Sequence, residues 1–201
     1  MLKNTALKLE NISNSQSLQI PHWKSLRSPA KHDCRDLVKI FAQEFSAYRT
    51  RLVPGGEEPF YQVARDSHDW HRLIFREDFF ASALHECAHW CIAGEARRQQ
   101  DDFGYWYQAG GRNEEEQNAF YRAEVKSQAL EALFSLACGF VFSPSLDNLG
   151  HARGNVEAFE EAVYAQMWHY CENPPPRAGL FVHALQNYYS PYSTVSLESS
   201  C

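Results

Sequence analysis

Two histidines one helical turn apart are the residues of this chain whose spacing most directly predicts chemistry. His85 and His89 flank Glu86, Cys87 and Ala88 in the run HECAH. Because a helix turns once every 3.6 residues or so, side chains four positions apart point from nearly the same face, and both imidazoles could reach one metal ion. Glu86 lies about a quarter-turn away, beside a water or substrate on that ion. The run alone also fits two histidines that hydrogen-bond buried polar groups.

The segment around this pair is predicted to be a helix at 78–98. Asp78 is a suitable N-cap, no proline interrupts the segment, and its apolar residues would place the histidines on a buried helix beside a cleft. One class of metalloenzymes continues this motif with a glycine and then a third histidine. Ile92 and Glu95 occupy those two positions here, which excludes that class. The third ligand is therefore expected on a second helix.

That second helix is predicted at 113–137, where apolar residues recur every three or four positions. Glu124, Ser127, Gln128 and Glu131 lie on or beside its core-facing stripe. A carboxylate is costly to bury there unless it is paired or bound to a metal. Glu124 and Glu131 are almost two full turns apart, so spacing does not choose between them as a third ligand. Either glutamate also fits a solvated helix edge with ordinary ion pairs.

The rest of the chain predicts an α+β fold in which helices dominate. Residues 1–31 are rich in Asn and Ser, so they are expected to form a partly disordered extension ahead of one domain at 32–201. Asp33 is expected to cap a helix in which Phe45 and Tyr48 face inward. Short strands are expected at 49–53, 60–64 and 71–75, and further helices at 156–170 and 178–188.

Composition and charge exclude several classes of protein. The chain has 201 residues, 44% of them hydrophobic, which is enough for one substantial core and too apolar for a largely disordered protein. A net charge of −6 argues against general nucleic-acid binding. The start of the chain does not resemble a signal peptide, and no apolar run approaches the length of a membrane span. We therefore expect a cytoplasmic protein with no direct contact to nucleic acid or membrane.

The cysteines predict no metal or redox site of their own. The chain has six, and no Cys-x-x-Cys pair occurs among them, so a zinc knuckle is not expected. Cys87 and Cys91 share a helix face that points well away from the histidines. We expect them to be small buried thiols.

Longer runs carry more information than the short motif. They are LHECAHWCIAGEARR, DFGYWY, Gly111-Arg112, AEVKSQALEALF and ALQNYY. In these runs, their order and their spacing, the chain resembles the elongation factor P hydroxylase family over about residues 33–189. It departs from the family by carrying residues to roughly His32 ahead of the similar region and by cysteines at 87 and 138. Neither departure removes a proposed ligand.

This resemblance implies a zincin-like, metallopeptidase-type fold with a metal held by two histidines and a glutamate. Carried over, it assigns His85, His89 and Glu124 as ligands, because Glu124 lies in the family's Glu-Val-Lys-x-Gln-Ala-Leu segment. It therefore favours Glu124 over Glu131. Members of the family hydroxylate the modified lysine of elongation factor P after β-lysine has been attached. The resemblance thus implies a non-haem metal-dependent monooxygenase whose partner is elongation factor P carrying β-lysyl-lysine.

The identity of the metal follows less directly from the ligands. Two imidazoles and one carboxylate leave open positions on one side of a divalent ion. With Zn(II), such a site polarises a water that Glu86 could deprotonate, which is the chemistry of a metallopeptidase. With Fe(II), it supports hydroxylation of an unactivated carbon, and Glu86 would handle protons. We expect Fe(II), since the resemblance implies oxygen insertion. A zinc metallopeptidase and a catalytically silent metal-binding protein stay open as alternatives.

An aromatic run at 102–107 lies between the two ligand helices and is expected at the rim of the cleft. Its rings could pack along a long aliphatic lysine side chain. The hydroxyl of Tyr105 or Tyr107 could donate a hydrogen bond to a bound oxygen, which makes both candidate catalytic residues. The rings could equally close the core beneath the loop. Cations that could face an acidic protein partner are Arg97, Arg98, Arg112, Arg122 and Lys126.

Overall fold

Five α-helices and a three-stranded sheet make up the part of the chain that this computed structural model describes, residues 32–103, 112–146 and 154–189. The helices are α1 (Cys34–Phe45), α2 (Phe80–Ile92), α3 (Glu114–Cys138), α4 (Val156–Glu172) and α5 (Pro176–Tyr189), with 3-10 turns η2 (Ser46–Tyr48) and η3 (Arg97–Gln99). The predicted α+β class with dominant helices is confirmed. The predicted extension at 1–31 lies outside the described residues.

The sheet is small and mixed. Its strands are β1 (Thr50–Gly56), β2 (Phe60–Gln62) and β3 (His71–Arg76), in the order β1-β3-β2. The central strand β3 runs parallel to β1 and antiparallel to β2. All three predicted strands are present, and β1 extends past its predicted end at residue 53.

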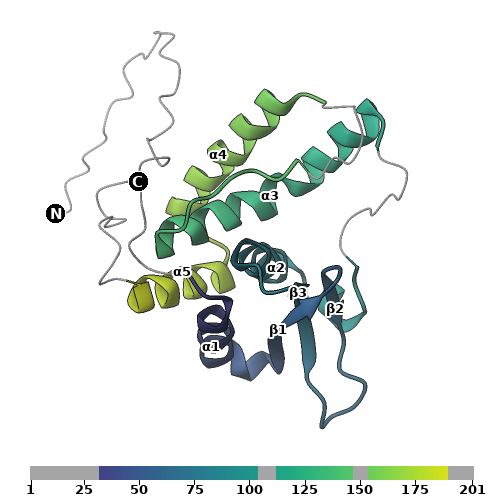
Figure 1. Cartoon of the computed structure of the whole chain (residues 1–201), viewed down its shortest axis with the longest axis vertical. Coiled ribbons are helices and arrows are strands. Elements are labelled where there is room, and N and C mark those ends of the chain that lie inside the picture. Colours follow the sequence, from purple (N-terminus) through teal and green to yellow (C-terminus); the bar gives the residue numbers. More distant parts are fainter. Residues whose placement is uncertain (1–31, 104–111, 147–153, 190–201) are drawn as a thin grey trace, which may run out of the picture.

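Helix α2 occupies the centre of the structure. It contacts β3, α3, α5 and α1, and in Figure 1 it is seen nearly end-on between the sheet and α3. Helix α4 packs along α3, and α5 packs against both α3 and α1. Within the described ranges, none of the helices has the length and apolar character needed to cross a membrane.

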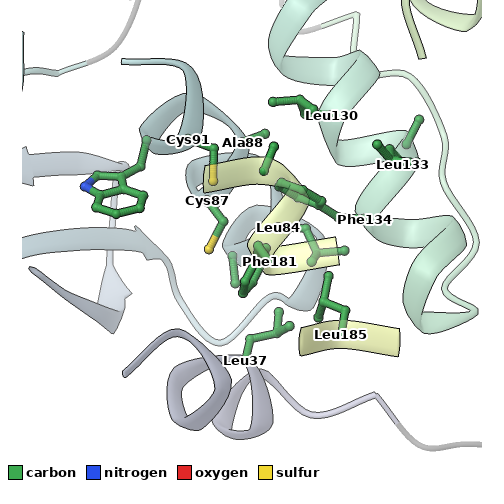
Figure 2. Packing of buried hydrophobic residues seen from close by; sticks show 14 of the residues in the cluster. Leu37, Leu84, Cys87, Ala88, Cys91, Leu130, Leu133, Phe134, Phe181 and Leu185 are labelled. Carbon is green, nitrogen blue, oxygen red and sulfur yellow. The ribbon is translucent and has the colours of Figure 1, made fainter. Parts of the chain in front are cut away.

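The core around α2 is built from three helices. Leu84, Cys87 and Cys91 of α2 lie close to Phe134 of α3 and Phe181 of α5, and all five are buried (Figure 2). The two phenylalanine rings meet edge to face, with centroids 5.0 Å apart. The prediction that Cys87 and Cys91 are small buried thiols is confirmed.

Two of the predicted helix starts are confirmed. Asp33 caps α1 by accepting a hydrogen bond from the backbone N–H of Arg35 at 2.9 Å. Asn113 and Glu116 form a reciprocal capping box at the start of α3. The inward placement of Tyr48 is wrong, because its side chain is 41% exposed. Tyr48 is the last residue of η2. The tighter 3-10 turn breaks the α-helical register that would have turned this side chain inward.

The predicted start of the histidine helix is also wrong. Asp78 does not cap α2, which begins at Phe80 after a cap residue, Phe79, that makes no side-chain hydrogen bond. The Ser82 hydroxyl instead accepts a hydrogen bond from the backbone N–H of Arg76 at 3.0 Å, which ties the first turn of α2 to the end of β3. The helix ends at Ile92, earlier than predicted, and Gly94 follows shortly after its end.

Candidate metal centre

His85 and His89 lie on one face of α2 with their rings directed at the same space. Their Nε2 atoms are 3.0 Å apart, and their ring planes are inclined at 81°. Both side chains are half-buried. The spacing of four residues therefore brings two imidazole nitrogens together, as the helical repeat predicts.

Glu124 of α3 supplies an oxygen to each histidine. Its Oε2 lies 3.5 Å from Nε2 of His85, and its Oε1 lies 3.5 Å from Nε2 of His89. The Ser127 hydroxyl donates a hydrogen bond of 2.9 Å to Oε2 and so holds the carboxylate in place. Burial alone would raise the pKa of Glu124, but the adjacent histidines and this hydrogen bond outweigh burial and lower the pKa to about 2. Glu124 is therefore an anion.

Glu131, almost two turns further along the same stripe of α3, contacts the other ring nitrogen of His85. The distance from its Oε2 to Nδ1 of His85 is 2.8 Å. Since a carboxylate accepts, Nδ1 carries the hydrogen, and in the neutral ring Nε2 keeps a free lone pair directed at His89 and Glu124. Burial opposes the charged form of His85, yet the contact with Glu131 raises the pKa of the imidazole to about 10, so a metal ion at Nε2 would have to displace a proton from that nitrogen.

These contacts decide between the alternatives that spacing left open. Glu124 and Glu131 are only 3% and 7% exposed, so neither lies on a solvated helix edge. Glu124 faces both Nε2 atoms, whereas Glu131 reaches only the opposite nitrogen of His85. Of the two carboxylates, Glu124 is the one placed beside both converging nitrogens.

The three side chains fit a metal ion. Nitrogen and oxygen ligands lie about 2.0–2.2 Å from zinc, so two ligands of one such ion are no more than about 4.4 Å apart. The separations of 3.0 and 3.5 Å among His85, His89 and Glu124 fall below that limit. Among the residues that the structure describes, these three side chains are close enough together to hold one metal ion. The donor set suits both zinc and non-haem iron.

The cluster opens into a pocket of about 890 Å³. Its walls come from α2, α3 and β2 and from the segments at 97–103 and 143–145. Glu86 lines this pocket and is half-buried. Burial raises its pKa, and the neighbouring histidines oppose that rise only in part. A carboxyl group of this kind can hold a proton close to the cluster.

One wall of the pocket was not predicted from the sequence. Gln128 of α3 donates to the carbonyl of Ser145 at 2.8 Å, and its Oε1 accepts from the backbone N–H of Ser145 at 2.9 Å. Gln117 donates to the carbonyl of Leu146 at 2.7 Å. These amides fasten an irregular segment along α3, and Ser143 and Ser145 of that segment line the pocket. The sequence placed Gln128 on or beside the core-facing stripe of α3, but it did not indicate which backbone groups the amide would meet.

Several predicted rim residues are placed differently. Arg112 is buried, with its guanidinium 4.0 Å from the centroid of the Phe120 ring, so its assignment to a partner-facing surface is wrong. Arg97 forms an ion pair with Asp102 inside the pocket wall. Tyr105 and Tyr107 lie outside the described residues, and their catalytic roles stay predictions.

The geometry defines a class: a helix-dominated α+β protein in which two helices bring two histidines and a carboxylate together at the floor of a pocket. A family model described as Elongation factor P hydroxylase matches residues 40–199. The chain is also 44% identical over 169 residues to the Elongation factor P lysine hydroxylase of Haemophilus influenzae, a match that covers 83% of this chain and 95% of that relative. The chain belongs to the elongation factor P hydroxylase family.

Proposed function

We propose that this protein hydroxylates a lysine residue of elongation factor P. The observation that carries the proposal is the 44% identity to the Haemophilus influenzae relative over 83% of this chain and 95% of that relative. We also propose that the lysine carries β-lysine, because a pocket of about 890 Å³ has room for a long side chain. Neither the family match nor the relative supports a zinc metallopeptidase or a catalytically silent protein.

The metal of this proposal is one ferrous ion held by His85, His89 and Glu124. Iron bound by two imidazoles and one carboxylate supplies open positions for dioxygen chemistry at an unactivated carbon. The surrounding residues prepare the ligands. Glu131 holds the hydrogen on Nδ1 of His85, so that Nε2 is free to bind, and Ser127 orients the carboxylate of Glu124.

Glu86 is the proposed proton carrier. When one atom of dioxygen enters a C–H bond, the other leaves as water, and that water requires two protons and two electrons from a reductant. A Glu86 carboxyl group whose pKa is raised by burial can deliver a proton from its Oε atom to the pocket. Tyr105 and Tyr107 are proposed as hydrogen-bond donors to bound oxygen. We further propose a zincin-like fold and, because the described cysteines are free, a cytoplasmic location.

The hydrogen bonds along the sheet edge beside the pocket favour an inserted side chain over an extended peptide backbone as the substrate. Enzymes can hold an extended peptide by pairing it with an exposed strand edge. Here the outward N–H and C=O of Tyr61 in β2 already pair with Asp102, at 2.8 and 2.9 Å. The N–H of Val63 bonds to the carboxylate of Asp101 at 2.8 Å. With this edge occupied, the pocket suits a side chain inserted from a folded protein.

Mass spectrometry of the factor tests the proposal. The protein is purified without oxygen, loaded with Fe(II) and mixed with β-lysylated elongation factor P, dioxygen and ascorbate as reductant. We expect a gain of about 16 mass units on the modified lysine, as an oxygenase site of this type predicts. A His89→Ala variant is the matched control and should give no gain. Cleavage of the factor by zinc-loaded protein, or a reaction that needs no oxygen, would overturn the assignment.

A further inference from the structure

Two phenylalanines form a stacked pair at the entrance to the pocket. The ring centroids of Phe60 and Phe103 are 4.2 Å apart, and their planes are inclined at only 27°. Both residues line the pocket. The Phe103 side chain nevertheless stays 76% exposed, the largest exposure of any large hydrophobic residue described.

The backbone explains why the pair is held in place. Tyr61 and Asp102 exchange two backbone hydrogen bonds as an antiparallel bridge. The next residues outward, Phe60 and Phe103, are then directly opposite each other on one face, as cross-strand neighbours are. The ion pair between Asp102 and Arg97 further anchors the segment that carries Phe103. The backbone that carries the pair is therefore held by the protein's own hydrogen bonds, which lowers the entropic cost of ordering it around a ligand.

One of the carboxylates that line the pocket is exposed. Its carboxylates belong to Glu58, Glu86, Asp102, Glu124 and Glu131, and its guanidinium groups to Arg76, Arg97 and Arg98. Arg97 is paired with Asp102, and Arg98 donates to the carbonyl of Ala93 at 2.5 Å. Glu58 is exposed, whereas the other four carboxylates are half-buried or buried. Glu58 is therefore the exposed carboxylate of this lining, two residues before Phe60 in the sequence, where it can attract a cation.

We propose that Phe60 and Phe103 bind the aliphatic stem of the substrate's lysine-type side chain, with Glu58 attracting its ammonium group. This inference rests on the proposed function for its substrate. Stacked aromatic faces contact methylene groups well, and their electron-rich faces also attract cations. The pair therefore selects long aliphatic amines over short or anionic side chains.

Steady-state kinetics with β-lysylated elongation factor P test this contact. We expect Phe103→Ala to raise KM about tenfold while kcat and iron content stay within about twofold of the wild type, because the ring acts in binding and lies outside the metal cluster. Phe103→Leu should recover most of the loss. Glu58→Gln should raise KM about threefold. The matched controls are Phe79→Ala, which removes an exposed phenylalanine that does not line the pocket, and Glu57→Gln beside Glu58.

A binding measurement keeps this inference separate from the proposed function. Hexylamine and hexanoate are titrated into metal-loaded wild type and Phe103→Ala, and binding is followed by saturation-transfer NMR. We expect hexylamine to bind the wild type at least fivefold more tightly than the variant, and hexanoate to bind neither well. Equal binding of hexylamine to both proteins, or an unchanged KM in Phe103→Ala, would overturn the role of the pair. A wild type that binds hexylamine but never hydroxylates the factor would overturn only the proposed function.

Discussion

Helix α2 carries two pairs of potential metal ligands at the same spacing, and they have opposite surroundings. His85 and His89 face two carboxylates of α3 at the floor of the pocket. Cys87 and Cys91 face the apolar core, where Figure 2 shows them beside Leu84 and Phe181. Spacing of four residues therefore creates a pair of neighbouring side chains on a helix, and the facing elements decide whether the pair can bind a metal.

Electrostatics accounts for the difference. A cysteine binds metal as the thiolate, and burial raises the pKa of both thiols, that of Cys87 well above its ordinary value. The buried carboxylate of Glu124 has the opposite shift, because the imidazoles beside it compensate for its lost hydration. The histidine face can thus accommodate a cation, while the cysteine face keeps neutral thiols.

Removing either histidine should have the largest effect on the difference between the two faces of α2, because it removes metal binding from the histidine face. We expect His85→Ala or His89→Ala to abolish stoichiometric binding of a divalent metal, because two of three ligands cannot hold it tightly. Cys87→Ala and Cys91→Ala are the matched controls and should keep full occupancy. Elemental analysis of anaerobically purified proteins gives the metal per chain, and circular dichroism checks the fold. Full occupancy in His89→Ala would show that the ion does not bind at this cluster.

Much of this arrangement was predictable from local patterns. Apolar periodicity places the helix of Glu124 at 113–137, within one residue of its observed bounds, and finds the histidine helix although its predicted end at 98 lies beyond Ile92. The thiol and imidazole faces of α2 follow from the helical repeat alone. These features depend on residues close in the sequence, which is why the sequence is sufficient for them.

Features that depend on how elements cross were not predictable. Glu124 and Glu131 share one stripe of α3, and only the position of α2 along that stripe places the first beside both Nε2 atoms and the second beside Nδ1 of His85. The pocket wall held by Gln128 belongs to a segment without periodicity. The start of α2 was also not predictable from nearby residues. It depends on the hydrogen bond between Ser82 and Arg76, which joins α2 to the sheet, and Asp78 does not cap the helix.

The two glutamates offer a finer test of the histidine face. We expect Glu131→Gln to weaken metal affinity by about 10–100-fold, because the amide orients His85 less strongly and does not increase its basicity. Glu124→Gln removes an anionic ligand and should lose the metal, so it serves as the comparison. Competition with a fluorescent chelator measures both affinities. An occupied Glu124→Gln together with a metal-free Glu131→Gln would show that the roles of the two carboxylates are reversed.

On the opposite face of α2, a small polar substitution should lower the free energy of unfolding without changing metal occupancy. Cys87→Ser introduces a hydroxyl of similar size into the apolar core, and we expect the free energy of unfolding to fall by about 1–3 kcal/mol. Cys87→Ala, which removes the thiol without adding a polar group, is the matched control for the lost sulfur. Urea denaturation measures both losses. A fall in metal occupancy in either variant would mean that the two faces of α2 are not independent.

The smallest expected effect concerns Ser127, which touches the cluster only through Glu124. Its hydroxyl donates to Oε2 of that carboxylate at 2.9 Å and also lies 3.0 Å from the backbone carbonyl of Glu124. Ser127→Ala leaves the negative charge in place and removes one hydrogen bond to it. We therefore expect metal affinity to fall only about three- to tenfold, in line with the net contribution of one such bond.

Two measurements distinguish this orienting role from a structural one. Chelator competition should show the reduced affinity in Ser127→Ala, while urea denaturation of the metal-free protein should differ from the wild type by less than about 1.5 kcal/mol. Ser127→Thr keeps a hydroxyl at the same position and should restore affinity if the helix accommodates the added methyl group. A larger loss than Glu131→Gln causes would contradict this order of effects, since Ser127 contributes one neutral hydroxyl to Glu124, whereas Glu131 contributes a carboxylate to His85.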